Sequence, residues 1–513
     1  MKVTSANNKR IAKNTILLYI RMLLMLAISL YTSRIILRVL GIEDYGINNV
    51  VGGVITMLGF FTSSLGGASS RFITFELGRG DMKTLKNTFG NILCIHLVLA
   101  GIVLVIGETI GLWFMTTQIQ IPAERETAAF WVYQFSIFSS MLAVSCVPYN
   151  ATIIAHEKMS AFAYISLVDA LLKLLIVFLL MIVPFDKLIT YAFLFLGIQL
   201  NDRLIYGIYC IRHFEETRIK PKIDKNQFNE ILCYAGWTMN GNLAVMGYTQ
   251  GLNILLNIFF GPVVNAARGI AVQVQNICQQ FCTNFQMAVN PQITKCYAQR
   301  EFDNMHKLIK RSSKFSFYIL FFIILPLSLE AEVVLQLWLG NVPEYTISFL
   351  RLILVIGLFY TLINPILTSV HATGKLKRFQ LIEGSMLLSI VPIAYILLNF
   401  FNAQPEIVFV VHLVVEFFTQ IVRLKIVLPM IQMSIMSYVN EVIKPILKVV
   451  ICSIPIPFIS YIYMDKGFFS FFIICAICVI MTMSVIYVIG CTDKEKKFIR
   501  EKVGIAIDRI KGL

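Results

Sequence analysis

The sequence predicts an all-α polytopic membrane protein, with about fourteen transmembrane helices arranged as two pseudo-symmetric six-helix bundles and two further C-terminal helices. Three observations lead to this fold class. Long apolar stretches follow one another from end to end of the 513 residues. Hydrophobic residues make up 57% of the chain and charged residues only 14%, whereas a soluble chain carries about a quarter charged residues. The basic residues fall mainly into every second loop.

Each apolar stretch is long enough to cross a hydrocarbon core of about 30 Å at about 1.5 Å per residue. Leu, Ile, Val, Phe, Ala and Met dominate these stretches. The expected spans are 14–40, 45–69, 87–115, 127–155, 161–184, 188–212, 231–258, 262–290, 315–338, 346–371, 379–401, 404–428, 447–464 and 468–490.

Lysine and arginine set the expected orientation of the spans. Roughly 34 of the 44 basic residues lie on one side of these spans, which the positive-inside rule assigns to the cytoplasm. The sequence therefore predicts a multi-pass membrane protein with both termini in the cytoplasm. Topology and anionic inner-leaflet lipid account for the net charge of +15, so this charge does not indicate nucleic-acid binding.

The chain also contains an internal duplication. When the sequence is aligned with itself, one register places Gly41 on Gly261, and a closely similar register places Pro148 on Pro365. We therefore expect an N-lobe over 1–225 with helices 1–6, a C-lobe over 226–428 with helices 7–12, and a region 429–513 with helices 13–14 and a basic cytoplasmic tail. Parallel repeats of this kind are one known transporter plan, with the substrate site between the halves.

Four tracts carry a resemblance to a known family: SRIILRVLGIEDYGINNVVGG, RFITFELGRGD, FGPVVNAARGIAVQVQ and NFQMAVNPQITKCYA. They resemble bacterial polysaccharide flippases, the O-antigen and capsule repeat-unit exporters of the multidrug/oligosaccharidyl-lipid/polysaccharide exporter superfamily. The resemblance implies two bundles around a V-shaped cavity that opens alternately to each side. It also implies undecaprenyl-diphosphate-linked oligosaccharide as cargo, and it suggests other polysaccharide assembly proteins as partners.

A diphosphate cargo inside the membrane needs fixed cations, preferably arginine, and amides that replace water around the sugar. Ionisable residues within spans are functional candidates by default. Arg34 and Arg268 lie at similar depth, one in each expected lobe, and Arg268 shares a helical face with several amides. The expected substrate-binding residues are Arg34, Arg268, Asn265, Gln275, Gln279, Asn242, Asn253 and Arg21.

Each of these residues also has a structural interpretation. A transmembrane arginine can extend its head group to the interface, and amide stripes can join helices through hydrogen bonds. The acidic candidates Asp169 and Glu416, with Lys173 beside Asp169, leave two interpretations open. They bind H⁺ or Na⁺ and couple a gradient to transport, or they form static ion pairs. The sequence predicts no cofactor and no metal site.

Enzymatic activity is not expected, because the chain has no P-loop, no HExxH motif and no nucleophile elbow. The closest alternative function is a cation-coupled multidrug or small-molecule extruder of the same superfamily. Such a protein prefers cationic amphiphiles and an acidic cavity. The excess of basic over acidic residues inside the expected spans favours an anionic cargo instead. A non-transporting scaffold is a third alternative.

Overall fold

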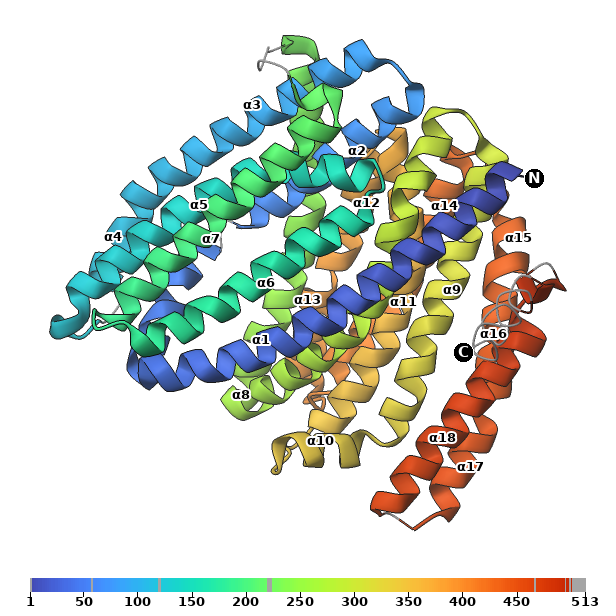
Figure 1. Cartoon of the computed structure of the whole chain (residues 1–513). Helices are drawn as coiled ribbons and strands as arrows, with labels where there is room; N and C mark the ends of the chain where they lie inside the picture. The colour runs from blue at the N-terminus through green and yellow to red at the C-terminus, as the bar shows by residue number, and fades with distance from the viewer. Residues whose placement is uncertain are drawn as a thin grey trace, which may run out of the picture. The chain divides into compact units, whose positions relative to one another are not determined.

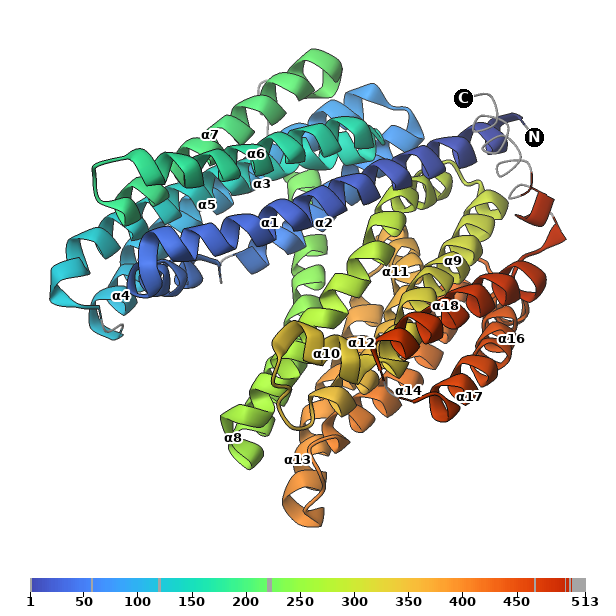
Figure 2. The same ribbon diagram turned by 60° about the horizontal axis from the view of Figure 1, so that its bottom comes forward.

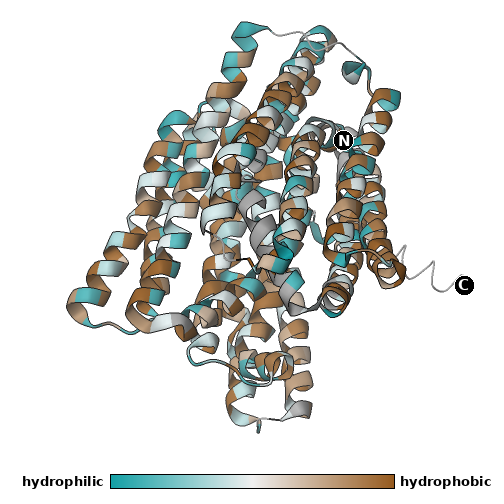
Figure 3. Cartoon of the chain, turned by 90° about the vertical axis from the view of Figure 1, so that its left-hand side faces the viewer, coloured by the Kyte–Doolittle hydropathy of each residue, from teal (hydrophilic) through white to brown (hydrophobic). Residues whose placement is uncertain are grey.

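The structure is a computed structural model that describes residues 2–56, 59–118, 121–218, 224–465, 467–493, 495–497 and 500. In these ranges the chain is almost entirely α-helical and forms no strand (Figure 1). Apolar residues dominate the bodies of the helices, and many hydrophilic residues lie near their ends (Figure 3). Nearly all of the predicted basic tail lies outside the described residues.

Eleven of the described helical segments are long and apolar enough to cross a membrane, which makes the chain a multi-pass membrane protein. They correspond to the predicted spans 3–7 and 9–14. The predicted spans 14–40 and 262–290 are helical as well. In the first of them, the apolar run Asn14–Ser29 is shorter than a membrane span. In the second, the amides and Arg268 lower the mean hydropathy. The all-helical fold class predicted from the sequence is confirmed.

Contacts divide the chain into two compact units. The first unit comprises Met1–Asn242 and Met287–Glu301, and in it α5 packs against α2, α3 and α7 while α1 packs against α6 (Figure 1). Its helices are α1 (Lys2–Thr56), α2 (Gly59–Arg79), α3 (Met82–Ile106), α4 (Leu112–Gln118), α5 (Glu126–Ala155), α6 (Met159–Ile182), α7 (Lys187–His213) and the two ends of α8 (Lys225–Ala298).

The second unit comprises Leu243–Gln286 and Phe302–Leu513. Its core forms where α11 packs against α9 and α14. Outside this core, α18 packs against α9, α16 and α17 (Figure 2). Besides the middle of α8, its helices are α9 (Phe302–Leu329), α10 (Ala331–Leu339), α11 (Thr346–Thr373), α12 (Lys377–Leu388), α13 (Ile390–Phe401), α14 (Ile407–Met430), α15 (Ile435–Tyr438), α16 (Lys444–Ser453), α17 (Pro455–Tyr463) and α18 (Phe468–Val485).

The border between the units runs through α8, after Asn242 and again after Gln286. It therefore differs from the boundary at 225/226 that hydropathy suggests. Hydropathy indicates only where a span begins. The contacts of each part of α8 decide to which unit that part belongs. The division into lobes of six helices stays a prediction.

The backbone repeats where the sequence repeats. α1 and α8 each continue through one residue with non-helical torsion angles, Gly41 with φ 82° and ψ 172° and Gly261 with φ 79° and ψ −175°. These are the two glycines that the self-alignment of the sequence superimposes. A side chain at positive φ with an extended ψ is strained, so this conformation is nearly restricted to glycine. The first long helix of each repeat is therefore interrupted by a glycine in the same backbone conformation.

A second pair of aligned positions agrees as well. Pro148 lies inside α5 and Pro365 inside α11, and the turn after each helix contains one residue at positive φ, Glu157 (58°) or Gly374 (75°). A glutamate at positive φ is uncommon. The carboxylate of Glu157 is buried and accepts a hydrogen bond of 2.8 Å from Lys295 Nζ. This ion pair accounts for the choice of residue at a position where the other repeat uses glycine.

Replacing Gly261 with alanine is expected to lower the free energy of unfolding by about 1–3 kcal/mol, because the new side chain must adopt the strained conformation. In the described part of the chain, no atom beyond the two chain neighbours lies within 4 Å of the position that a Cβ would occupy at Gly261, so crowding does not contribute. Gly269 is a matched control, since it has the same open surroundings and an ordinary helical φ. Thermal unfolding in detergent would measure both variants, and an equal loss of stability in Gly269→Ala would contradict the explanation.

Candidate binding and ion sites

Arg268 lies on α8 in the second unit, seven residues after the helix is interrupted at Gly261. Because of this interruption, its guanidinium reaches the part of α8 that precedes Gly261. Nη1 donates a hydrogen bond to Asn253 Oδ1, and Nη2 donates one of 3.1 Å to the carbonyl oxygen of Thr249. Asn253 and Arg268, predicted on different spans, therefore form one site.

Arg268 carries a buried charge, since its side chain belongs to a residue that is only 8% exposed. Among the described residues, its Nε has no hydrogen-bond partner and no carboxylate forms an ion pair with it. A buried guanidinium held only by an amide and a carbonyl oxygen retains a strong attraction for an anion.

The other amides on the same face of α8 as Arg268, which include Gln286, divide into two groups. Gln275 Nε2 donates to the carbonyl oxygen of Ile353 (3.2 Å), and the buried Gln286 Nε2 donates to Ser316 Oγ (3.0 Å) and to a carbonyl oxygen of α11. These two residues join helices. Asn265 Oδ1 and Gln279 Oε1 are buried and have no hydrogen-bond partner among the residues that the structure describes, so they keep free acceptor capacity.

Replacing Gln286 with leucine is expected to cost about 1–3 kcal/mol of stability, because Ser316 and the carbonyl oxygen of Thr361 lose their buried partner. Gln279→Leu is the matched control, because Gln279 Oε1 has no hydrogen-bond partner among the described residues that the substitution would leave unpaired. Both variants would be compared by thermal unfolding in detergent. An equal effect of the two substitutions would contradict the assignment of Gln286 to helix joining.

The remaining predicted cargo residues belong to the first unit. Asn242 belongs to the first unit and donates a hydrogen bond of 2.8 Å to Ser64 Oγ. Arg21, also in the first unit, lies over the ring of Phe162 at 4.4 Å, and its buried Nε has no hydrogen-bond partner in the described ranges. The side chain of Arg34 lies outside the described part of the structure. Arg34 and Arg21 therefore remain predicted cargo residues.

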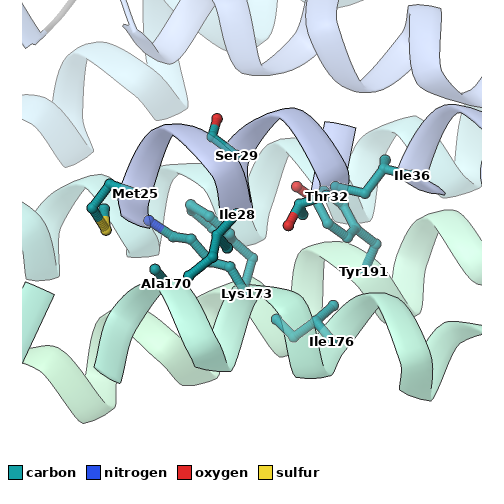
Figure 4. Close-up of a pocket in the computed structure, with 10 residues that line it drawn as sticks. Met25, Ile28, Ser29, Thr32, Ile36, Ala170, Lys173, Ile176 and Tyr191 are labelled. Carbon is teal, nitrogen blue, oxygen red and sulfur yellow. The ribbon is translucent and has the colours of Figure 1, made fainter. Parts of the chain in front are cut away.

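Lys173, one of the ion-coupling candidates of the first unit, helps to line a pocket of about 300 Å³ between α1, α6 and α7 (Figure 4). Lys173 Nζ donates a hydrogen bond of 2.9 Å to Asp169 Oδ2. The carboxyl group of Asp202 on α7 interacts with that of Asp169. Lys173 thus interacts with both carboxyl groups, those of Asp169 and Asp202. This arrangement fits a proton site as well as a static ion pair.

The second unit contains an equivalent arrangement, which we call the carboxylate triad: Glu383, Arg423 and Glu416. Arg423 Nε donates to Glu383 Oε1 (2.6 Å), and Nη1 donates to Glu416 Oε1. Arg423 and Glu416 are 3% and 0% exposed. The ion pair with Arg423 gives Glu416 a structural role, and its role in ion coupling stays a prediction.

Sequence reasoning did not identify Glu383 as the partner of Arg423. A signal was present, because Asp169 and Asp202 have the same separation along the chain as Glu383 and Glu416. Each pair joins the fifth and sixth predicted spans of its repeat.

Among the described residues, no group of three or more His, Cys, Asp or Glu side chains is arranged to hold a metal ion.

Comparison with known proteins identifies the fold. No family profile and no curated protein sequence matches the chain. Among solved structures, a MATE transporter in its bent conformation aligns with a TM-score of 0.71 and 15% identity, over 85% of this chain and 96% of that one. A MATE-family multidrug resistance transporter of the MOP superfamily, in an outward-facing conformation, aligns at 0.68 with 16% identity, over 84% and 96%.

A third similar structure is a MOP superfamily transporter from Pyrococcus furiosus, described as having a binding pocket of reversed polarity that suggests a different function. It aligns with a TM-score of 0.63 and 16% identity, over 80% of this chain and 94% of that one. The chain therefore has the fold of the MATE transporters across most of its length.

Proposed function

We propose that this protein is a transporter of the multidrug/oligosaccharidyl-lipid/polysaccharide exporter superfamily. Its proposed cargo is an oligosaccharide linked through a diphosphate to undecaprenol. The protein moves this lipid-linked repeat unit from the cytoplasmic to the outer leaflet of the bacterial inner membrane by alternating access, for the synthesis of surface polysaccharide. The MATE fold supports transport, and the chemistry of the second unit supports the choice of cargo.

The observation that carries this proposal is the buried charge of Arg268. A diphosphate brings at least two negative charges into the membrane, which is prohibitively costly without fixed cations. Arg268 offers its positive charge without an acidic partner among the described residues, and Asn253 holds the guanidinium in place. Planar guanidinium groups bind phosphate oxygens through two parallel hydrogen bonds. The free oxygens of Asn265 and Gln279 would accept hydrogen bonds from sugar hydroxyl groups.

A multidrug extruder is the second candidate function. The similar structures favour it directly, because several of them are MATE transporters and one is described as a multidrug resistance transporter. The Pyrococcus furiosus protein supports the view that pockets of opposite polarity occur on this fold. Cationic drugs would need an acidic site, which Asp169, Asp202 and the carboxylate triad could supply only from residues already engaged with Lys173 or Arg423.

Reconstituted proteoliposomes would distinguish the two candidates. A fluorescent polyprenyl diphosphate and the cationic dye ethidium would be offered to the same preparation. Movement of the diphosphate lipid between leaflets, without accumulation of ethidium, is the expected result. Ethidium transport with no acceleration of diphosphate-lipid movement would overturn the proposed cargo and establish the multidrug function.

A further inference from the structure

The side chain of Glu157, in the turn between α5 and α6, joins three segments of the first unit. Lys295 Nζ donates a hydrogen bond of 2.8 Å to its Oε1, and Gln292 Nε2 donates one of 3.0 Å to its Oε2, both from the end of α8. Arg10 Nε, on α1, lies 3.0 Å from Oε2. Asn14 Nδ2, also on α1, donates to the main-chain oxygen of Glu157 (3.3 Å). Segments that are far apart in the sequence therefore meet at one carboxylate.

Glutamate is an unusual residue for this position in the backbone. Glu157 has φ 58°, a conformation that is strained for residues other than glycine. In the register that places Pro148 on Pro365, the equivalent residue of the second repeat is Gly374, with φ 75°. Glycine would relieve the strain, so the backbone does not explain Glu157. Strained residues cluster at functional sites, and the carboxylate is the part of this residue that glycine lacks.

The carboxylate and its cations differ in their exposure to solvent. The side chain of Glu157 is 1% exposed, whereas those of Lys295 and Arg10 are 24% and 49% exposed. An anion that approaches this end of the unit therefore meets the two cations before it meets Glu157. The orientation expected from the sequence places this end in the cytoplasm, the side from which the proposed cargo enters.

We propose that Arg10, Gln292 and Lys295 form an entry site for the diphosphate headgroup, and that Glu157 occupies this site as an internal substitute when no cargo is bound. This inference rests on the proposed function, because it adds a second binding site for the same cargo. Donors that hold a carboxylate oxygen also bind a phosphate oxygen. A diphosphate brings at least two negative charges, against one on Glu157, so it competes for the two cations.

Exchange of Glu157 for the headgroup also releases the segments that this carboxylate joins. The start of α1 and the end of α8 then no longer share a partner in the turn after α5. Arrival of the cargo thereby loosens this end of the first unit. In the empty protein, Glu157 keeps the same cations from binding other anions.

Binding of a short-chain polyprenyl diphosphate to the full chain in detergent tests the entry site. The variants are made in the background Arg268→Ala, so that the site at Arg268 does not contribute. Glu157→Gly removes the internal substitute and places glycine at positive φ, as the second repeat does at Gly374. The dissociation constant is expected to fall by about tenfold, because no fraction of the site is then blocked by the carboxylate. Addition of Lys295→Met should reverse this gain.

Two further variants support the interpretation. Glu157→Gln is used in case Glu157→Gly fails to fold, and its neutral amide should give a smaller fall in the dissociation constant, because an amide competes for cations less well than a carboxylate. Glu215→Gln is the matched control, because it removes one negative charge from the same unit at a side chain that is 67% exposed and lies 3.7 Å from Lys86. It should leave the dissociation constant unchanged.

The outcomes separate this inference from the proposed function. A dissociation constant that is unchanged or raised in both Glu157 variants would overturn the entry site and leave the cargo assignment intact. A gain in affinity that persists after Lys295→Met would do the same, because the gain would not come from the released cation. Absence of lipid binding by the wild type would overturn both proposals.

Discussion

Arg268→Ala is expected to weaken binding of the diphosphate cargo by about 2–5 kcal/mol, which is at least about thirtyfold, and to reduce transport accordingly. The reason is the buried position of the guanidinium, which has no carboxylate partner among the described residues. Removal of the side chain deletes the charge that would pair with phosphate and leaves Asn253 Oδ1 without its donor. Movement of a fluorescent polyprenyl diphosphate in proteoliposomes would measure the effect.

Two further variants make this experiment specific. Arg268→Lys keeps the charge but loses the planar fork, so partial transport is expected if charge alone contributes and much less if the fork matters. Arg351→Ala is the matched control, because Arg351 is exposed on α11 and donates a hydrogen bond of 2.9 Å to the carbonyl oxygen of Ser328. Wild-type transport by Arg268→Ala would refute the role of this residue. Increased ethidium export by the same variant would favour the multidrug extruder.

The sequence predicted the helical framework well because its signals are local. Span length, hydropathy and the aligned glycines Gly41 and Gly261 are each read within one stretch of chain, and the structure has helices with the same break at both glycines. The face of α8 that carries Arg268 was predictable for the same reason. What the amides on that face contact was not, since Gln286 finds Ser316 and Thr361 only through tertiary packing.

The pairing of Arg423 with Glu383 shows why ionic sites are harder to predict. The two residues are 40 positions apart on α12 and α14, and neither helix alone indicates the partner. The two acid pairs have equal separations along the chain, one pair in each repeat, and this is a sequence signal that points to such a partner. The repeats differ in the cation, Lys173 in the first unit and Arg423 in the second.

Arg423→Met is expected to lower the free energy of unfolding by about 3–5 kcal/mol, because it leaves Glu383 and Glu416 buried without their cation. The triple variant Arg423→Met, Glu383→Gln, Glu416→Gln removes all three charges and should recover much of that loss. Lys310→Met is the control, because it breaks an ion pair whose acid, Glu441, is largely exposed, and it should cost about 1 kcal/mol or less. Thermal unfolding in detergent would compare all of them.

The same measurement bears on the protonation of the triad. If Glu383 and Glu416 are both ionised in the empty protein, the loss of Arg423 leaves two like charges near each other, and stability should fall most at high pH. Acidification then protonates the carboxylates and narrows the difference between Arg423→Met and the wild type. A difference independent of pH between 5 and 8 would mean that the charge of the pair does not change in this range.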